Sequence, residues 1–167
     1  MGKIFTDESG ELTFDFSACD SAYRADDVNY TGLSAVDFIA ETSEDFYFIE
    51  VKNLDNSSIP IDLIATQKEK FLIKVDGNEF KRDICSKIKD SLLKKIALGQ
   101  KIAKPVTYIL VLEYKALDSS QRRRLYLDIG SNIPRFSEPE YTAIHSIKFD
   151  LCSKTEYDSK YQTFLAR

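Results

Sequence analysis

The sequence predicts an α/β domain in which a mixed β-sheet is flanked by helices. Two long apolar segments, 46–54 and 106–114, have the composition of buried strands, and a lysine-rich amphipathic segment, 83–98, has the period of a helix between them. The 167 residues suit one domain, which can bury a full core without disulfides or structural metals. We therefore expect residues 1–167 to form a single domain.

The first third of the chain predicts mainly short strands. Apolar and polar residues alternate within 3–16 around a Glu-Ser-Gly turn, which predicts a β-hairpin. Residues 18–28 are polar with scattered alanines, and we expect a short helix there. Residues 35–41 and 46–54 predict two strands joined by a hairpin loop at 42–45.

Helices and strands alternate in the rest of the chain. The helix at 83–98 is the clearest, because it has an apolar stripe at helical spacing. The stripe consists of Ile84, Ile88, Leu92 and Ile96, which recur every four residues, with Leu93 widening it. The expected elements are a helix from Pro60 toward Lys74, the 83–98 helix, a strand at 106–114, a helix at 118–129, a strand at 141–151 and a terminal helix at 155–165.

Cysteine and histidine content excludes several kinds of site. The three cysteines, Cys19, Cys85 and Cys152, are odd in number and widely spaced, which argues against a disulfide framework or a thiolate zinc site. His145 is the only histidine, so multi-histidine zinc chemistry is excluded, and we interpret it as a structural residue in the last strand. Hydrolytic chemistry in this chain would have to use carboxylates, lysines and a hard metal ion.

The chain carries no segment that suggests a membrane or export. No apolar run approaches the about 18 residues of a membrane span, and the N-terminus has no apolar stretch typical of a secretory signal. We therefore expect a cytoplasmic protein.

Charge is distributed unevenly. Residues 1–65 contain 14 acidic and 3 basic residues, whereas residues 66–104 contain 11 basic and 5 acidic residues, within a net charge of −4. One interpretation is a carboxylate-rich metal site beside a phosphate-binding surface. The other is two solvated faces that pair with each other or with a second copy.

An acid and a lysine interrupt the apolar strand at 46–54. Glu50 and Lys52 are two residues apart, so their side chains point to one face of the strand, while Val51 points to the other. If 42–45 is the loop, Asp37 lies directly opposite Glu50 on the neighbouring strand. Facing residues have Cβ atoms about 5 Å apart, so Asp37, Glu50 and Lys52 are expected to converge.

Two converging carboxylates repel each other unless a proton or a cation lies between them. Mg²⁺ prefers such hard oxygen ligands and often uses one or two carboxylates with water and substrate phosphate. We therefore predict a Mg²⁺ or Mn²⁺ site at Asp37 and Glu50, with Lys52 placed to orient a metal-bound water.

The pattern Asp37, twelve residues, then Glu50-Val51-Lys52 resembles the core of the PD-(D/E)XK nuclease superfamily over residues 18–115. The resemblance implies a restriction-endonuclease-like fold and a metal-dependent nuclease that hydrolyses phosphodiester bonds of DNA or RNA. It also implies that Asp37, Glu50 and the main-chain carbonyl of Val51 bind metal, and that Lys52 assists the attacking water. Val36 stands where the family usually has proline.

Further ligands and partners follow from the same resemblance. Some members add an acid from an upstream helix, for which Asp20, Asp26 and Asp27 are open candidates, with Asp27 slightly favoured. The helix after the motif often lines nucleic acid, which implies contacts from Lys87 and Lys94. These two lysines share a helix face, so they could contact successive phosphates. The alternative is an ordinary solvated, lysine-rich helix face. Members often act as homodimers.

A second function class stays open. The net acidity and small size also fit a catalytically silent module with this fold, acting as a subunit of a larger nucleic-acid-processing or defence complex.

Overall fold

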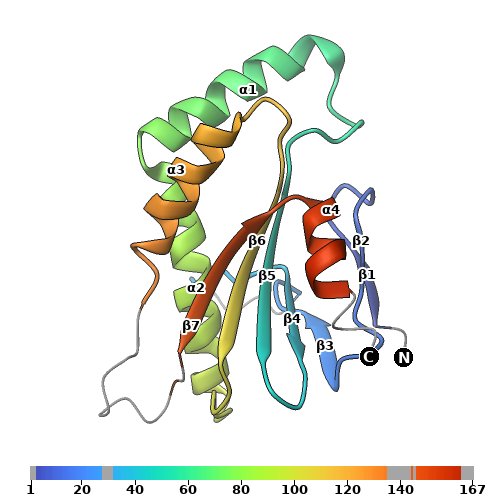
Figure 1. Cartoon of the computed structure of the whole chain (residues 1–167), viewed down its shortest axis with the longest axis vertical. Coiled ribbons are helices and arrows are strands. Elements are labelled where there is room, and N and C mark those ends of the chain that lie inside the picture. The colour runs from blue at the N-terminus through green and yellow to red at the C-terminus, as the bar shows by residue number, and fades with distance from the viewer. Residues whose placement is uncertain (1–2, 28–31, 135–143, 145, 163–167) are drawn as a thin grey trace.

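The computed structural model describes residues 3–27, 32–134, 144 and 146–162. These residues form three layers (Figure 1). A mixed sheet lies in the middle, three helices (α1 to α3) cover one face, and a hairpin (β1–β2) with a short helix (α4) covers the other. The predicted α/β class with a mixed sheet flanked by helices is therefore confirmed.

The central sheet of the described residues has five strands in the order β3-β4-β5-β6-β7. Strands β3, β4 and β5 are antiparallel, whereas β5, β6 and β7 run parallel. The central strands β5 and β6 are apolar because both of their faces are covered. The strand bounds are Ser21–Arg24 for β3, Phe38–Glu41 for β4, Phe46–Asn53 for β5, Val106–Glu113 for β6 and Ile147–Cys152 for β7.

Two helices make the crossover from β5 to β6. Helix α1, Ile61–Asp76, begins after Pro60, and α2, Glu79–Ala97, follows a tight turn in which Asn78 adopts a φ of 60°. Asparagine tolerates this left-handed conformation better than most residues, which allows two helices to be joined so closely. Helix α3, Ser119–Gly130, connects β6 to β7 and starts with a capping box formed by Asp118 and Gln121.

The opposite face of the sheet is covered by smaller elements. Strands β1, Ile4–Thr6, and β2, Thr13–Asp15, form the predicted hairpin. Helix α4, Lys154–Tyr157, continues into a π-helical turn at Asp158–Gln162. Phe14 of the hairpin and Tyr157 of α4 meet edge-to-face at 5.1 Å, so both elements join one aromatic core layer.

The helix-side core fixes α2 against the sheet. Ile84, Ile88 and Leu92 of α2 are buried against β5 and β6, as the four-residue spacing predicts. Leu93 and Ile96, predicted in the same stripe, are instead 50% and 43% exposed, so the buried face is narrower and ends earlier than predicted. The buried Tyr108 hydroxyl of β6 donates a 2.9 Å hydrogen bond to the carbonyl of Ile84. These contacts hold α2 in a fixed position over β5 and β6.

Several predicted elements need correction. The described part of the predicted helix at 18–28, residues 18–27, is not helical, because Ser21–Arg24 pairs with β4 as the edge strand β3. Helix α2 begins at Glu79, four residues earlier than predicted, since the turn at Asn78 leads directly into it. His145 and residues 141–143 of the predicted 141–151 strand lie outside the described residues; β7 begins at Ile147. Among the described helices, none has both the length and the apolar character to cross a membrane.

Candidate active site

The pairing of β4 with β5 places the predicted acids together. Phe38 pairs with Ile49, so Asp37, one residue before β4, continues that register toward Glu50. The main-chain N–H of Val51 donates a 2.6 Å hydrogen bond to Asp37 Oδ2, which holds the carboxylate against β5. The predicted register is therefore confirmed.

Alternation along β5 turns the charged residues toward the helices. Phe48 belongs to the core layer under α2, and Glu50 and Lys52 follow it at two-residue steps on the same face. Ile49 and Val51 belong to the opposite layer, under the hairpin. The predicted split between Glu50 and Lys52 on one face and Val51 on the other is thus confirmed.

A network of ion pairs connects the two acids to two lysines. Asp37 is 6% exposed and Glu50 is fully buried. Lys52 Nζ lies 2.6 Å from Glu50 Oε1. Lys87, from the middle of α2, places its Nζ 2.7 Å from Glu50 Oε1 and 3.7 Å from Asp37 Oδ1. The structure therefore brings Asp37, Glu50 and Lys52 together and adds Lys87.

Burial determines the ionisation of this network. Burial raises the pKa of Glu50 to about 7, and the neighbouring Asp37 adds to the rise, while Lys52 and Lys87 oppose it. Burial also raises the pKa of Asp37, against the opposing effect of Lys87. Burial disfavours the ammonium form of Lys52, but contact with Glu50 outweighs it and raises the pKa of Lys52. Both acids therefore bind a proton more tightly than a carboxyl group in water does, and Lys52 stays charged.

Asp37 also belongs to a cluster of three acids that sequence reasoning did not assemble. One carboxylate oxygen each from Glu8, Asp26 and Asp37 lie within 4.8 Å of one another. Glu8 comes from the β1–β2 turn and Asp26 from the segment after β3. Nothing in the sequence marks Glu8, because its approach depends on how the hairpin docks.

Of the three upstream acids considered, Asp26 rather than Asp27 belongs to the group of acids around Asp37. The Asp27 side chain is 68% exposed and lies 3.6 Å from Arg24 Nε. Asp20 is exposed at the start of β3, where its N–H bonds the carbonyl of Glu41. The predicted helix would have placed these acids differently from the strand that is observed.

The donor set around Asp37 fits a hard divalent cation. It consists of carboxylate oxygens, which Mg²⁺ and Mn²⁺ prefer. Among the described residues, the buried Asp26 Oδ1 accepts no hydrogen bond; it lies 3.7 Å from Arg24 Nε. A cation would satisfy this oxygen and reduce the repulsion among the three acids.

A cleft of about 510 Å³ opens beside Lys52 and Lys87. Lys74 of α1 contributes a third ammonium group, and Leu54, Phe71 and Phe80 form an apolar floor. The remaining lining residues are Ser34, Asp83, Ile84 and Ser86. The cleft therefore combines cationic side chains with an apolar surface directly next to the acid pair.

Lys94 lies apart from this cleft. Lys87 and Lys94 share a face of α2 as predicted, but that face is turned toward the sheet. Lys94 is 9% exposed and lines a small hollow of about 60 Å³ with Tyr23 and Lys95. Its predicted contact with nucleic acid stays a prediction, whereas Lys87 adjoins both the acids and the cleft.

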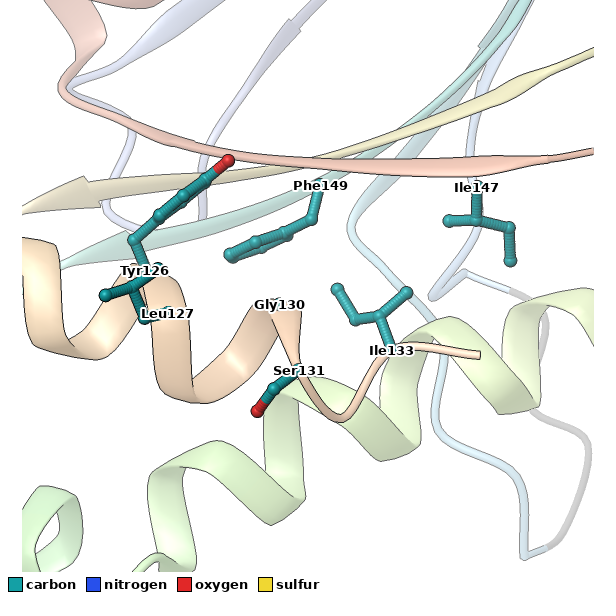
Figure 2. A pocket seen from close by; sticks show the side chains of 7 residues that line it. All are labelled: Tyr126, Leu127, Gly130, Ser131, Ile133, Ile147 and Phe149. Atoms are coloured by element: carbon teal, nitrogen blue, oxygen red, sulfur yellow. The ribbon is translucent and has the colours of Figure 1, made fainter. Parts of the chain in front are cut away.

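A second hollow, of about 320 Å³, lies between α3 and β7 (Figure 2). Tyr126 and Phe149 stack there with ring centroids 5.5 Å apart, and Ile133 and Ile147 add further apolar surface. Among the described residues, its lining includes no carboxylate or amine, in contrast to the cleft beside Lys52 and Lys87.

No protein-family model, curated protein or solved structure matches this chain. The candidate site therefore has to be interpreted from its own geometry.

Proposed function

We propose that the protein is a metal-dependent nuclease that hydrolyses phosphodiester bonds of DNA or RNA. The observation that carries the proposal is the convergence of buried Asp37 and Glu50 with Lys52 at the edge of a cleft with two further lysines. Burying carboxylates is unfavourable unless cations accompany them, so such clusters are typical of functional sites.

The metal would be held through Asp37. Glu50 and the Val51 carbonyl are the partners that the PD-(D/E)XK resemblance implies, and Glu8 with Asp26 form the second group of acids around the same residue. Bound Mg²⁺ or Mn²⁺ would stabilise negative charge on the phosphate and favour ionisation of a water. The mixed sheet and the position of the β4–β5 hairpin are compatible with a restriction-endonuclease-like fold, which we propose for the chain.

The protein's own side chains would orient the reactants. Lys52 keeps its charge and projects beside Glu50, so it can hold a water or a phosphate oxygen next to the acids. Lys74 and Lys87 line the cleft from two helices, and their ammonium groups would contact phosphates of a bound nucleic acid. The floor made by Leu54, Phe71 and Phe80 suits the apolar surface of a sugar or an unpaired base.

Cleavage assays test the proposal. Labelled single- and double-stranded DNA and RNA are incubated with the protein in Mg²⁺ or Mn²⁺, and we expect cleavage that EDTA abolishes. Lys52→Met should reduce the single-turnover rate about 100-fold, because the water or phosphate oxygen that Lys52 would hold loses its position. Asp37→Ala should remove activity.

Lys148→Met is the matched control, because Lys148 is an exposed lysine of β7 outside the cleft. Absence of cleavage on every substrate, or cleavage that survives Asp37→Ala and Lys52→Met, contradicts the proposal.

A specific contact favours a second candidate, a silent binding module of a larger complex. Glu50 is already neutralised by two ammonium groups at 2.6 and 2.7 Å, so the chain has an internal substitute for a metal. Titration calorimetry with Mg²⁺ and Mn²⁺ separates the candidates. No metal binding, together with a stable partner recovered by pull-down, favours the binding module.

A further inference from the structure

We infer that Lys87 is an internal counter-ion of the acid pair, and that a divalent cation must displace its ammonium group before Asp37 and Glu50 can share the metal. Lys87 thereby sets the metal affinity of the site. The inference rests on the proposed function only in taking these two acids as metal ligands.

The contacts of Lys87 differ from those of Lys52. Lys52 forms its short ion pair with Glu50, at 2.6 Å. Lys87 Nζ lies within 4 Å of both acids, 2.7 Å from Glu50 Oε1 and 3.7 Å from Asp37 Oδ1. A single positive group that contacts both carboxylates reduces their mutual repulsion, which is the electrostatic role expected of a shared cation.

The backbone at Lys87 is held in place, whereas its side chain can move into the adjoining cleft. Tyr108 bonds the carbonyl of Ile84, one turn before Lys87. Ser91 Oγ, one turn after it, accepts a 3.0 Å hydrogen bond from the Val36 N–H. The Lys87 side chain is 22% exposed and lines the 510 Å³ cleft, so its ammonium group can leave the acids without moving the helix.

Displacement would couple metal binding to substrate binding. An ammonium group released from the acids enters the cleft beside Lys74, where phosphate contacts are proposed. A phosphate in the cleft would attract the displaced Lys87 ammonium group, and a metal ion at the acids would repel it. Both ligands would therefore favour the same position of the Lys87 side chain. Each ligand is therefore expected to increase the affinity for the other, since such coupling is reciprocal.

Manganese titration of three proteins tests the inference. We compare wild type with Lys87→Gln, which removes the ammonium group, and with Lys89→Gln, a control at an exposed lysine of the same helix. Lys87→Gln should bind Mn²⁺ roughly tenfold more tightly than wild type, a typical size for coupling between two ligands. Lys89→Gln should match wild type. The double variant Lys87→Gln/Glu50→Gln should lose this increase in Mn²⁺ affinity.

The outcomes separate this inference from the proposed function. Equal Mn²⁺ affinity in wild type and Lys87→Gln overturns the inference and leaves the nuclease proposal intact. Binding in Lys87→Gln but not in wild type supports the inference and overturns the nuclease proposal. Binding in neither overturns both.

Folding of the variant is followed by circular dichroism. If Lys87→Gln is unfolded without metal, we test whether Mn²⁺ refolds it. Refolding of Lys87→Gln, but not of the double variant Lys87→Gln/Glu50→Gln, supports the inference. Failure of Mn²⁺ to refold Lys87→Gln, with Lys89→Gln folded, overturns it.

Discussion

The main-chain N–H of Val51 donates its hydrogen bond to the carboxylate of Asp37, at 2.6 Å. Asp37 lies one residue before β4, beyond the last backbone pair of the two strands, Phe38 with Ile49. Its side chain therefore provides one further contact between this segment and β5. The same acid therefore has a structural role in the hairpin and a proposed role in metal binding. These two roles can be separated by substitution.

Replacing Asp37 should affect stability according to whether an acceptor remains. Asp37→Ala leaves the buried Val51 N–H without its partner, which we expect to lower the free energy of unfolding by about 1–3 kcal/mol. Asp37→Asn keeps a side-chain oxygen at the same place and should lose less. Urea unfolding of both variants gives the comparison, and equal losses would show that this hydrogen bond does not stabilise the fold.

Ser91 should influence the site although it lies outside it. Its hydroxyl accepts a 3.0 Å hydrogen bond from the Val36 N–H and ties the residue before Asp37 to α2. Ser91→Ala should lower the free energy of unfolding by about 1–3 kcal/mol and reduce cleavage. Ser43→Ala, at an exposed position of the 42–45 turn, is the control for both measurements.

Glu50 should make stability depend on pH. Its pKa rises from 4.5 to about 7 on folding, so the native state holds this proton more tightly than the unfolded state. The contribution to stability is fully present below pH 4.5 and is lost as the pH rises through about 7. Asp37, whose pKa is also raised, acts in the same direction.

The check is the difference in unfolding free energy between wild type and Glu50→Gln, followed by urea unfolding across pH 4.5 to 7. Subtracting the variant removes the contributions of other carboxyls, such as Asp7, whose pKa is lowered. A difference that does not change with pH would contradict the raised pKa of Glu50.

Lys74 should contribute to nucleic-acid affinity without contributing to sequence preference. Its side chain is 51% exposed at the cleft and lies 3.4 Å from Glu79. Lys74→Ala should weaken binding of an oligonucleotide in EDTA and reduce the slope of log affinity against log salt by about one. Fluorescence anisotropy measures both, and Lys101→Ala, an exposed lysine beyond the far end of α2, should leave the slope unchanged.

The register of the acid-bearing hairpin could be predicted because it depends on local information. Loop length and alternation fix which residues of 35–41 and 46–54 face each other, and both signals are strong here. Most of the buried face of α2 was predictable for the same reason, since Ile84, Ile88 and Leu92 recur at helical spacing. The spacing could not show that Leu93 and Ile96 extend beyond the covered part of the sheet face and stay exposed. Local pattern was therefore enough to place Asp37, Glu50 and Lys52 on one face.

The remaining features depend on contacts between distant segments. The edge strand Ser21–Arg24 has only four residues, with the sequence Ser-Ala-Tyr-Arg, so its own sequence gives only a weak strand signal, and it is defined by pairing with β4. Glu8 reaches Asp37 only because the hairpin docks beside the sheet. Lys87 was expected to contact phosphate, and its contacts with Glu50 and Asp37 depend on the height of α2 over β5.

The turn at Thr42–Asp45, closed by a 2.9 Å hydrogen bond from the Thr42 N–H to the Asp45 carbonyl, limits which changes in length this chain can tolerate. A one-residue insertion or deletion there must either be absorbed in a bulge or shift β5 by one position. Such a shift would send Glu50 and Lys52 to the side of Phe14 and Tyr157 and bring Val51 under α2. Relatives of this protein should therefore vary in the composition of that turn while keeping its number of residues.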